Sequence, residues 1–67
     1  MKYWLGTITH CDLCKEPLQG TMHDARTMRG WANICHACFV DEDCKTGTGN
    51  GQTYRKQPDG RWLKVAG

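Results

Sequence analysis

Short runs rich in aromatic and β-branched residues are the main hydrophobic pattern along this chain. Segments that contain glycine or proline separate the runs, which is typical of strands joined by turns. The predicted strands cover residues 1–9, 21–27, 31–34, 53–56 and 61–65. The chain is therefore expected to be mostly β.

The segments between the runs predict how the strands connect. Pro58-Asp59-Gly60 separates the last two runs, and it is a strong turn signal because proline presets its φ angle and glycine tolerates a positive one. These two runs should form a C-terminal β-hairpin. Residues 39–45 are compatible with one helical turn or a short helix after the second cysteine pair, and residues 46–52 form a glycine-rich loop.

The chain has only 67 residues, of which 39% are apolar, and this leaves room for one domain with a small core. Such a core barely offsets the conformational entropy lost on folding, so a further source of stability is expected.

Four cysteines have the spacing of a metal site. Cys11 and Cys14 form one C-x2-C pair, Cys35 and Cys38 form another, and 20 residues separate the pairs. Two residues between cysteines let one tight turn direct both sulfurs to the same point, and two such turns supply four tetrahedral ligands. The predicted cofactor is one structural Zn²⁺ held by these four thiolates, because structural zinc adds about 10–16 kcal/mol to the folding of small peptides. We therefore expect a single zinc-ribbon-like domain over 1–67, with a metal core at 8–45, a glycine-rich loop at 46–52 and a basic, aromatic hairpin at 53–65.

Four other side chains are weighed as rival ligands and expected to be bystanders: His10, His23, His36 and Cys44. Cys44 is the strongest rival, since it could replace Cys38 or remain a free thiol. A rubredoxin-like iron centre also uses two C-x2-C pairs, but the proline and glycine residues that shape its turns are missing here. The odd number of cysteines and the absence of a secretory signal favour a reducing, cytoplasmic setting.

The positive charge is concentrated near the C-terminus. Residues 45–67 carry a net +4, residues 41–44 carry −3, and residues 1–40 carry +1. Cations alternate with rings in the predicted hairpin, a pattern found in surfaces that bind nucleic acid. The candidate binding residues are Arg55, Lys56, Arg61, Trp62 and Lys64. The competing interpretation, preferred for the rings, is that Tyr54 and Trp62 pack inward while the cations remain in water.

Several function classes are not expected. The chain contains no serine, and a zinc ion with four thiolates has no open position for water, so the protein is expected not to be an enzyme. Gln52-Thr53 follows the glycine run where a P-loop needs Gly-Lys-Ser/Thr. No apolar run approaches the length of a membrane span, and neither a membrane nor a small-molecule substrate is an expected partner.

Two segments resemble a known family. WANICHACF at residues 31–39 and GTGNGQTY at residues 47–54 are similar to small bacteriophage-encoded zinc-ribbon proteins of uncharacterised function. The resemblance implies a zinc ribbon and a phage or prophage origin.

The favoured hypothesis is a non-enzymatic zinc module that binds nucleic acid or serves as an accessory factor in transcription or replication. The alternative is a protein-interaction module that binds a host protein through an exposed Trp4, Trp31 or Trp62. An electron carrier is third.

Overall fold

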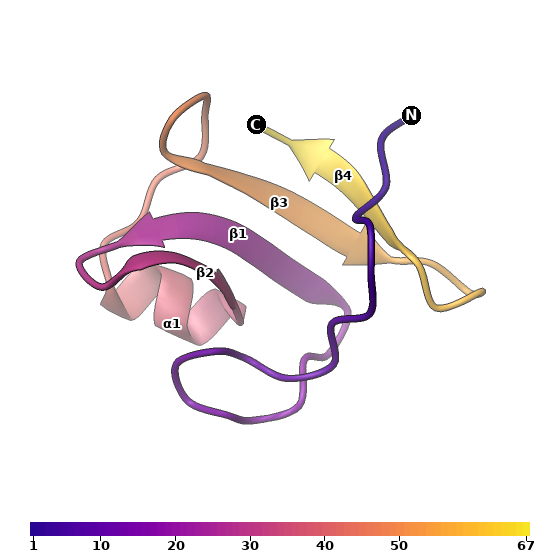
Figure 1. The fold of residues 1–67 in the computed structure, drawn as a ribbon, viewed down its shortest axis with the longest axis horizontal. Helices are drawn as coiled ribbons and strands as arrows, with labels where there is room; N and C mark the ends of the chain where they lie inside the picture. The colour runs from indigo at the N-terminus through magenta and orange to yellow at the C-terminus, as the bar shows by residue number, and fades with distance from the viewer.

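One antiparallel sheet organises the chain in the computed structural model, which describes all residues from 1 to 67 (Figure 1). The sheet has the strand order β2-β1-β3-β4, and a single short helix follows β2. The elements are β1 Thr21–Thr27, β2 Gly30–Ile34, α1 His36–Asp41, β3 Gly51–Lys56 and β4 Trp62–Ala66. The small, mostly β fold predicted from the sequence is confirmed.

The predicted turn chemistry agrees with the observed hairpins. Gly60 adopts a φ of +90° in the β3–β4 turn, and the Gln57 N–H donates to the Arg61 carbonyl at 2.7 Å to close it. Strand β1 has the predicted bounds, whereas β3 begins two residues earlier, at Gly51. This glycine is buried opposite Ala25, because β3 pairs with β1 as well as with β4.

The strand predicted over residues 1–9 is wrong. Only an isolated bridge between Tyr3 and Leu63 is present, and Gly6 bends the chain with a φ of +111°, outside the extended region that a continuous strand needs. The segment before the bend still covers the outer edge of β4. The Trp4 N–H donates to the Trp62 carbonyl at 2.9 Å, and the Lys64 N–H donates to the Lys2 carbonyl at 2.8 Å.

The helix begins earlier than residues 39–45 would place it. It starts at His36, inside the second cysteine pair, and the Phe39 N–H donates to the Cys35 carbonyl at 3.0 Å. Helical geometry is thus part of the second metal-ligand turn rather than an element that follows it. Asp43 has a φ of +53°, a left-handed conformation that follows the end of the helix.

The two faces of the sheet are covered by different parts of the chain (Figure 1). Helix α1 lies against β1, where Phe39 stacks on His23 with ring centroids 3.9 Å apart. On the opposite face Trp4 meets Tyr54 edge-on at 5.7 Å. The core is small, and its apolar members are Cys11, Leu18, Met22, Ala25, Ile34, Tyr54 and Trp62. The helix has neither the length nor the apolar character that crossing a membrane requires.

Candidate metal centre and hairpin surface

The first cysteine pair lies in a tight turn that precedes β1. The Lys15 N–H donates to the Cys11 carbonyl at 3.0 Å, and Lys15 adopts a φ of +67°. Within this turn Asp12 is tied to β2, because its carboxylate accepts the Asn33 N–H at 2.8 Å and its own N–H donates to the Asn33 carbonyl at 2.9 Å. These two bonds position the first pair beside the strand that leads to the second.

The second cysteine pair joins β2 to α1. Cys35 directly follows the last residue of β2 and occupies the N-cap position of the helix, and Cys38 lies in the first helical turn. One helical turn places both sulfurs on the side of the first pair. The strand, the helix start and the first turn therefore supply all four thiols.

The structure brings together the four cysteines predicted from the spacing. Their sulfurs all lie within 4.8 Å of one another. The Cys11 and Cys38 sulfurs are 3.7 Å apart, and those of Cys14 and Cys35 are 3.8 Å apart. A tetrahedral zinc with bonds of about 2.3 Å requires sulfur–sulfur edges of about 3.8 Å. The cluster therefore has the dimensions of a metal site with four thiolate ligands.

The thiols titrate unequally. Burial raises the pKa of Cys11, but hydrogen bonds from backbone N–H groups, led by that of Cys14, outweigh it and bring the pKa down to about 6. Burial and the neighbouring thiols raise the pKa of Cys38 far above its ordinary value. Thiolates this close repel one another, and a divalent cation at their centre would remove that repulsion and favour ionisation of all four.

None of the four rival ligands belongs to the cluster. The Cys44 thiol lies 3.6 Å from the Arg26 carbonyl, and burial, followed by the charges of Glu42 and Asp43, raises its pKa. His10 contacts the Thr9 hydroxyl at 2.9 Å.

The other two histidines form a contact that the sequence analysis missed. His23 Nε2 lies 3.0 Å from His36 Nδ1, and His23 Nδ1 lies 3.0 Å from the Thr53 hydroxyl. These two hydrogen bonds connect the helix that carries Cys38 to β1 and β3. No pattern signals it, since the three residues lie on separate elements and only their side-chain orientations join them.

The residues suggested for nucleic-acid binding do not lie on one surface. Lys56 pairs with Trp62 across the β3–β4 hairpin, and Lys64 pairs with Tyr54, so these four share one face, whereas Arg55 pairs with Leu63 on the other. Arg61 precedes β4 and forms an ion pair with Asp59 at 2.7 Å. The backbone and guanidinium hydrogen bonds from Arg61 lower the pKa of Asp59.

Trp62 is an interior residue. It is 2% exposed, and its indole N–H donates to the Ile8 carbonyl at 3.0 Å. The prediction that Tyr54 and Trp62 pack inward is confirmed, and the Trp62 ring is not accessible for stacking on a base.

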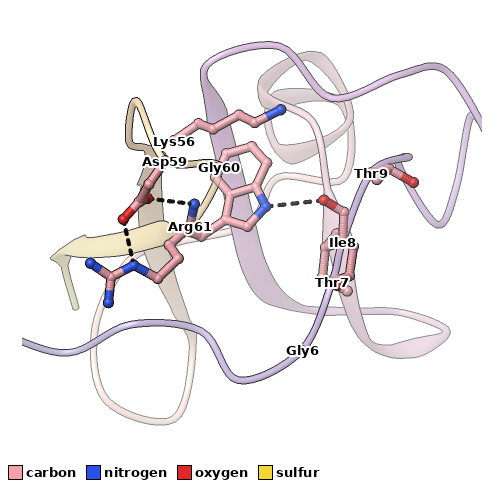
Figure 2. Close-up of a pocket in the computed structure, with 9 residues that line it drawn as sticks. Gly6, Thr7, Ile8, Thr9, Lys56, Asp59, Gly60 and Arg61 are labelled. Atoms are coloured by element: carbon pink, nitrogen blue, oxygen red, sulfur yellow. Dashed lines mark hydrogen bonds and ion pairs between the residues drawn. The ribbon is translucent and has the colours of Figure 1, made fainter.

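Lys56 extends across the Trp62 ring, with its ammonium 5.9 Å from the ring centroid (Figure 2). The Lys56 side chain lines one side of a groove of about 340 Å³, which we call the hairpin groove. The groove runs between residues 6–9 and the β3–β4 turn, and its remaining lining residues are Asp59, Gly60, Arg61 and Trp62.

Comparison with known proteins does not add a family to this picture. No protein-family model, curated protein or solved structure matches the chain. The cysteine cluster and the distribution of charge are therefore the features of the molecule that indicate a function.

Proposed function

We propose that this protein is a small zinc-binding module that acts by binding a partner rather than by catalysis. The observation that carries the proposal is the convergence of four cysteine sulfurs within 4.8 Å, with two of their edges at 3.7 and 3.8 Å. When bound there, Zn²⁺ supplies a closed coordination sphere whose binding energy stabilises the fold. Only nine residues of the chain are buried, so this contribution outweighs that of any single core side chain.

Zinc is preferred to iron for two reasons. Four thiolates at tetrahedral spacing suit either metal, but the proline and glycine residues that shape the turns of a rubredoxin-type iron centre are missing from both C-x2-C turns. No other feature of the chain points to electron transfer. Metal analysis separates the two, because an electron carrier would contain iron after purification under reducing conditions.

The binding function we propose is association with nucleic acid, as an accessory factor in transcription or replication. The charge distribution supports it. Residues 1–10 and 51–67 carry five Lys and Arg side chains and one carboxylate, whereas residues 11–50 carry four basic and six acidic side chains. Strands β3 and β4 and the segment along the edge of β4 belong to the first group, so one end of the sheet is cationic. The phage or prophage origin and the host-cytoplasm location implied by the family resemblance belong to this proposal.

The test is purification of the zinc-loaded protein from host lysate with and without nuclease. We expect one equivalent of zinc per chain, and co-purifying nucleic acid that nuclease or 0.5 M salt removes. Electrostatic association of this kind weakens steeply as salt rises. A metal-free protein that keeps its fold in a chelator would refute the zinc proposal. Absence of salt-sensitive nucleic-acid binding would refute the proposed partner.

A second candidate function is protein recognition at the β1–β2 end of the sheet. Trp31 is 50% exposed on the edge strand β2, and Met28 in the adjoining turn is 96% exposed. Tryptophan and methionine are enriched in protein interfaces. This candidate predicts capture of one host protein that survives nuclease and high salt and is lost in Trp31→Ser. Capture that Trp31→Ser leaves unchanged would refute it.

A further inference from the structure

A hollow lined only by apolar and aromatic side chains lies beside the cationic end of the sheet. It has a volume of about 270 Å³, and its walls are Tyr3, Trp4, Leu5 and Tyr54. Leu5 is 92% exposed at its rim. We call this feature the aromatic hollow. Tyr3, Trp4 and Leu5 lie outside the hairpin that the sequence indicated for nucleic-acid binding.

The aromatic hollow and the hairpin groove are neighbours. Residues 3–5 line the hollow, and residues 6–9, which follow directly, line the groove. Arg61 joins the two features, because it lines the groove while its guanidinium lies 4.1 Å from the centroid of the Tyr3 ring. An extended ligand could therefore contact both without leaving the surface.

The lysines around these features have no acidic partners within the chain, whereas Arg61 is paired with Asp59. Arg61–Asp59 is the one ion pair between side chains, so Lys2, Lys56 and Lys64 have no carboxylate to neutralise them. Lys56 lies over the groove, and Lys64 shares the sheet face of Tyr54. Free ammonium groups along a surface favour a ligand with repeated negative charges.

We propose that the hollow and the groove together bind single-stranded nucleic acid, an inference that rests on the nucleic-acid function proposed above. A phosphate lies in the hairpin groove near Lys56, the cation of the groove that has no carboxylate partner, since Arg61 is paired with Asp59. The neighbouring base enters the aromatic hollow and stacks on Trp4. A duplex hides the faces of its bases, whereas a single strand presents them to aromatic side chains beside a cationic track. The hollow thus selects the single-stranded form.

Fluorescence anisotropy on the zinc-loaded protein tests this inference with three labelled probes: 12-residue oligo(dT), 12-residue oligo(U) and a blunt 12-base-pair DNA duplex. We expect at least one single strand to bind tenfold or more tightly than the duplex at 0.1 M salt. Trp4→Leu retains an apolar side chain but removes the π face, and it should weaken single-strand binding by about 5- to 100-fold. Trp31→Leu, at the opposite end of the sheet, is the matched control and should change it less than twofold.

The groove is tested by comparing Lys56→Gln with Lys45→Gln. Lys45 is an exposed lysine within residues 11–50, outside the cationic end of the sheet. Lys56→Gln should lower the slope of log affinity against log salt by about 0.7, the value for one phosphate contact on a single strand, and Lys45→Gln should not. Thermal melting and zinc content must match the parent for every variant compared. Leu5→Ser serves as a second hollow variant if Trp4→Leu melts early, because the Leu5 side chain is exposed.

The outcomes separate the two proposals. Salt-sensitive binding that is equal for the duplex and both single strands, and unaffected by Trp4→Leu or Leu5→Ser, overturns the single-strand site and leaves the proposed nucleic-acid function standing. No binding to any of the three probes overturns both.

Discussion

Replacing one cysteine of the cluster tests the metal centre most directly, because the chain carries its own control. Cys38→Ser removes one of the four converging sulfurs, 3.7 Å from the sulfur of Cys11. Cys44→Ser makes the same chemical change just beyond helix α1, at a thiol whose hydrogen-bond partners are the Arg26 and Glu42 carbonyls. Both side chains are partly buried, so the two variants differ chiefly in whether the lost sulfur faces the other three.

The magnitude follows from the binding energy of structural zinc. If the four ligands contribute equally to about 10–16 kcal/mol, each supplies about 3–4 kcal/mol. Cys38→Ser should then weaken zinc binding by about 10²- to 10³-fold, since 1.4 kcal/mol corresponds to a factor of ten. This loss is a large fraction of the net stability of about 5–15 kcal/mol that is typical of a folded domain. Cys44→Ser should leave zinc affinity within about threefold of the parent.

Competition with a chromophoric chelator under reducing conditions measures the affinity. Absorption of the Co²⁺-loaded protein reports how many thiolates remain, because sulfur-to-cobalt charge-transfer intensity grows with the number of thiolate ligands. Zinc affinity of Cys38→Ser within threefold of the parent would refute the four-sulfur site. A loss in Cys44→Ser as large as that in Cys38→Ser would show that the ligand set is assigned wrongly.

Three further predictions concern the packing around the site. Trp62→Phe should lower the free energy of unfolding by about 1–3 kcal/mol, because it leaves the partly buried Ile8 carbonyl without its donor; chemical denaturation measures this. Gly51→Ala should lower the free energy of unfolding by about 1–3 kcal/mol, because a Cβ there would lie 2.6 Å from a backbone oxygen. Gly20→Ala should be tolerated, because there is open space around its Cβ, and thermal melting compares the two variants. Burial, and then the charge of the neighbouring imidazole, lower the pKa of His23 below 6.5, so the unfolded chain binds a proton there more readily. The stabilisation that depends on a neutral His23 is complete above pH 6.5 and is lost as the pH falls through the lower pKa of the folded state. The free energy of unfolding, measured by chemical denaturation, should therefore decline less steeply between pH 7 and pH 5 in His23→Gln than in the parent.

Each of these predictions has a contrary result. A Trp62→Phe variant as stable as the parent would mean that the indole N–H contributes no net stabilisation. Equal melting temperatures for the two glycine variants would contradict the close approach at Gly51. Parallel stability curves for the parent and His23→Gln across the acidic range would show that this imidazole is not held neutral by the fold. The zinc ligands are common to both proteins, so their protonation cancels in that last comparison.

The sequence alone was sufficient for the features that depend on local geometry. Two residues between cysteines dictate how the sulfurs of one turn lie, so Cys11, Cys14, Cys35 and Cys38 could be selected without knowing the sheet. Pro58 and Gly60 likewise predicted the β3–β4 turn through their own backbone preferences. The same kind of local signal gave a wrong prediction over residues 1–9. Their aromatic and β-branched composition predicted a continuous strand in spite of Gly6, whereas in the structure the positive φ of Gly6 ends the extended segment.

Only the tertiary structure decided which way the side chains of the hairpin face and what covers them. Alternation along a strand by itself puts the neighbours Arg55 and Lys56 on opposite faces, but only the register between β3 and β4 showed that Lys56 pairs with Trp62 and Arg55 with Leu63. Trp62 became interior because the segment around Ile8, whose carbonyl accepts the indole N–H, packs against the core that contains Trp62. These two residues lie 54 positions apart, and no local signal encodes such a contact. The aromatic hollow arises instead around the partly buried Trp4, where the N-terminal segment packs along β4. Local spacing thus determined which cysteines cluster, and long-range packing determined which side chains remain at the surface.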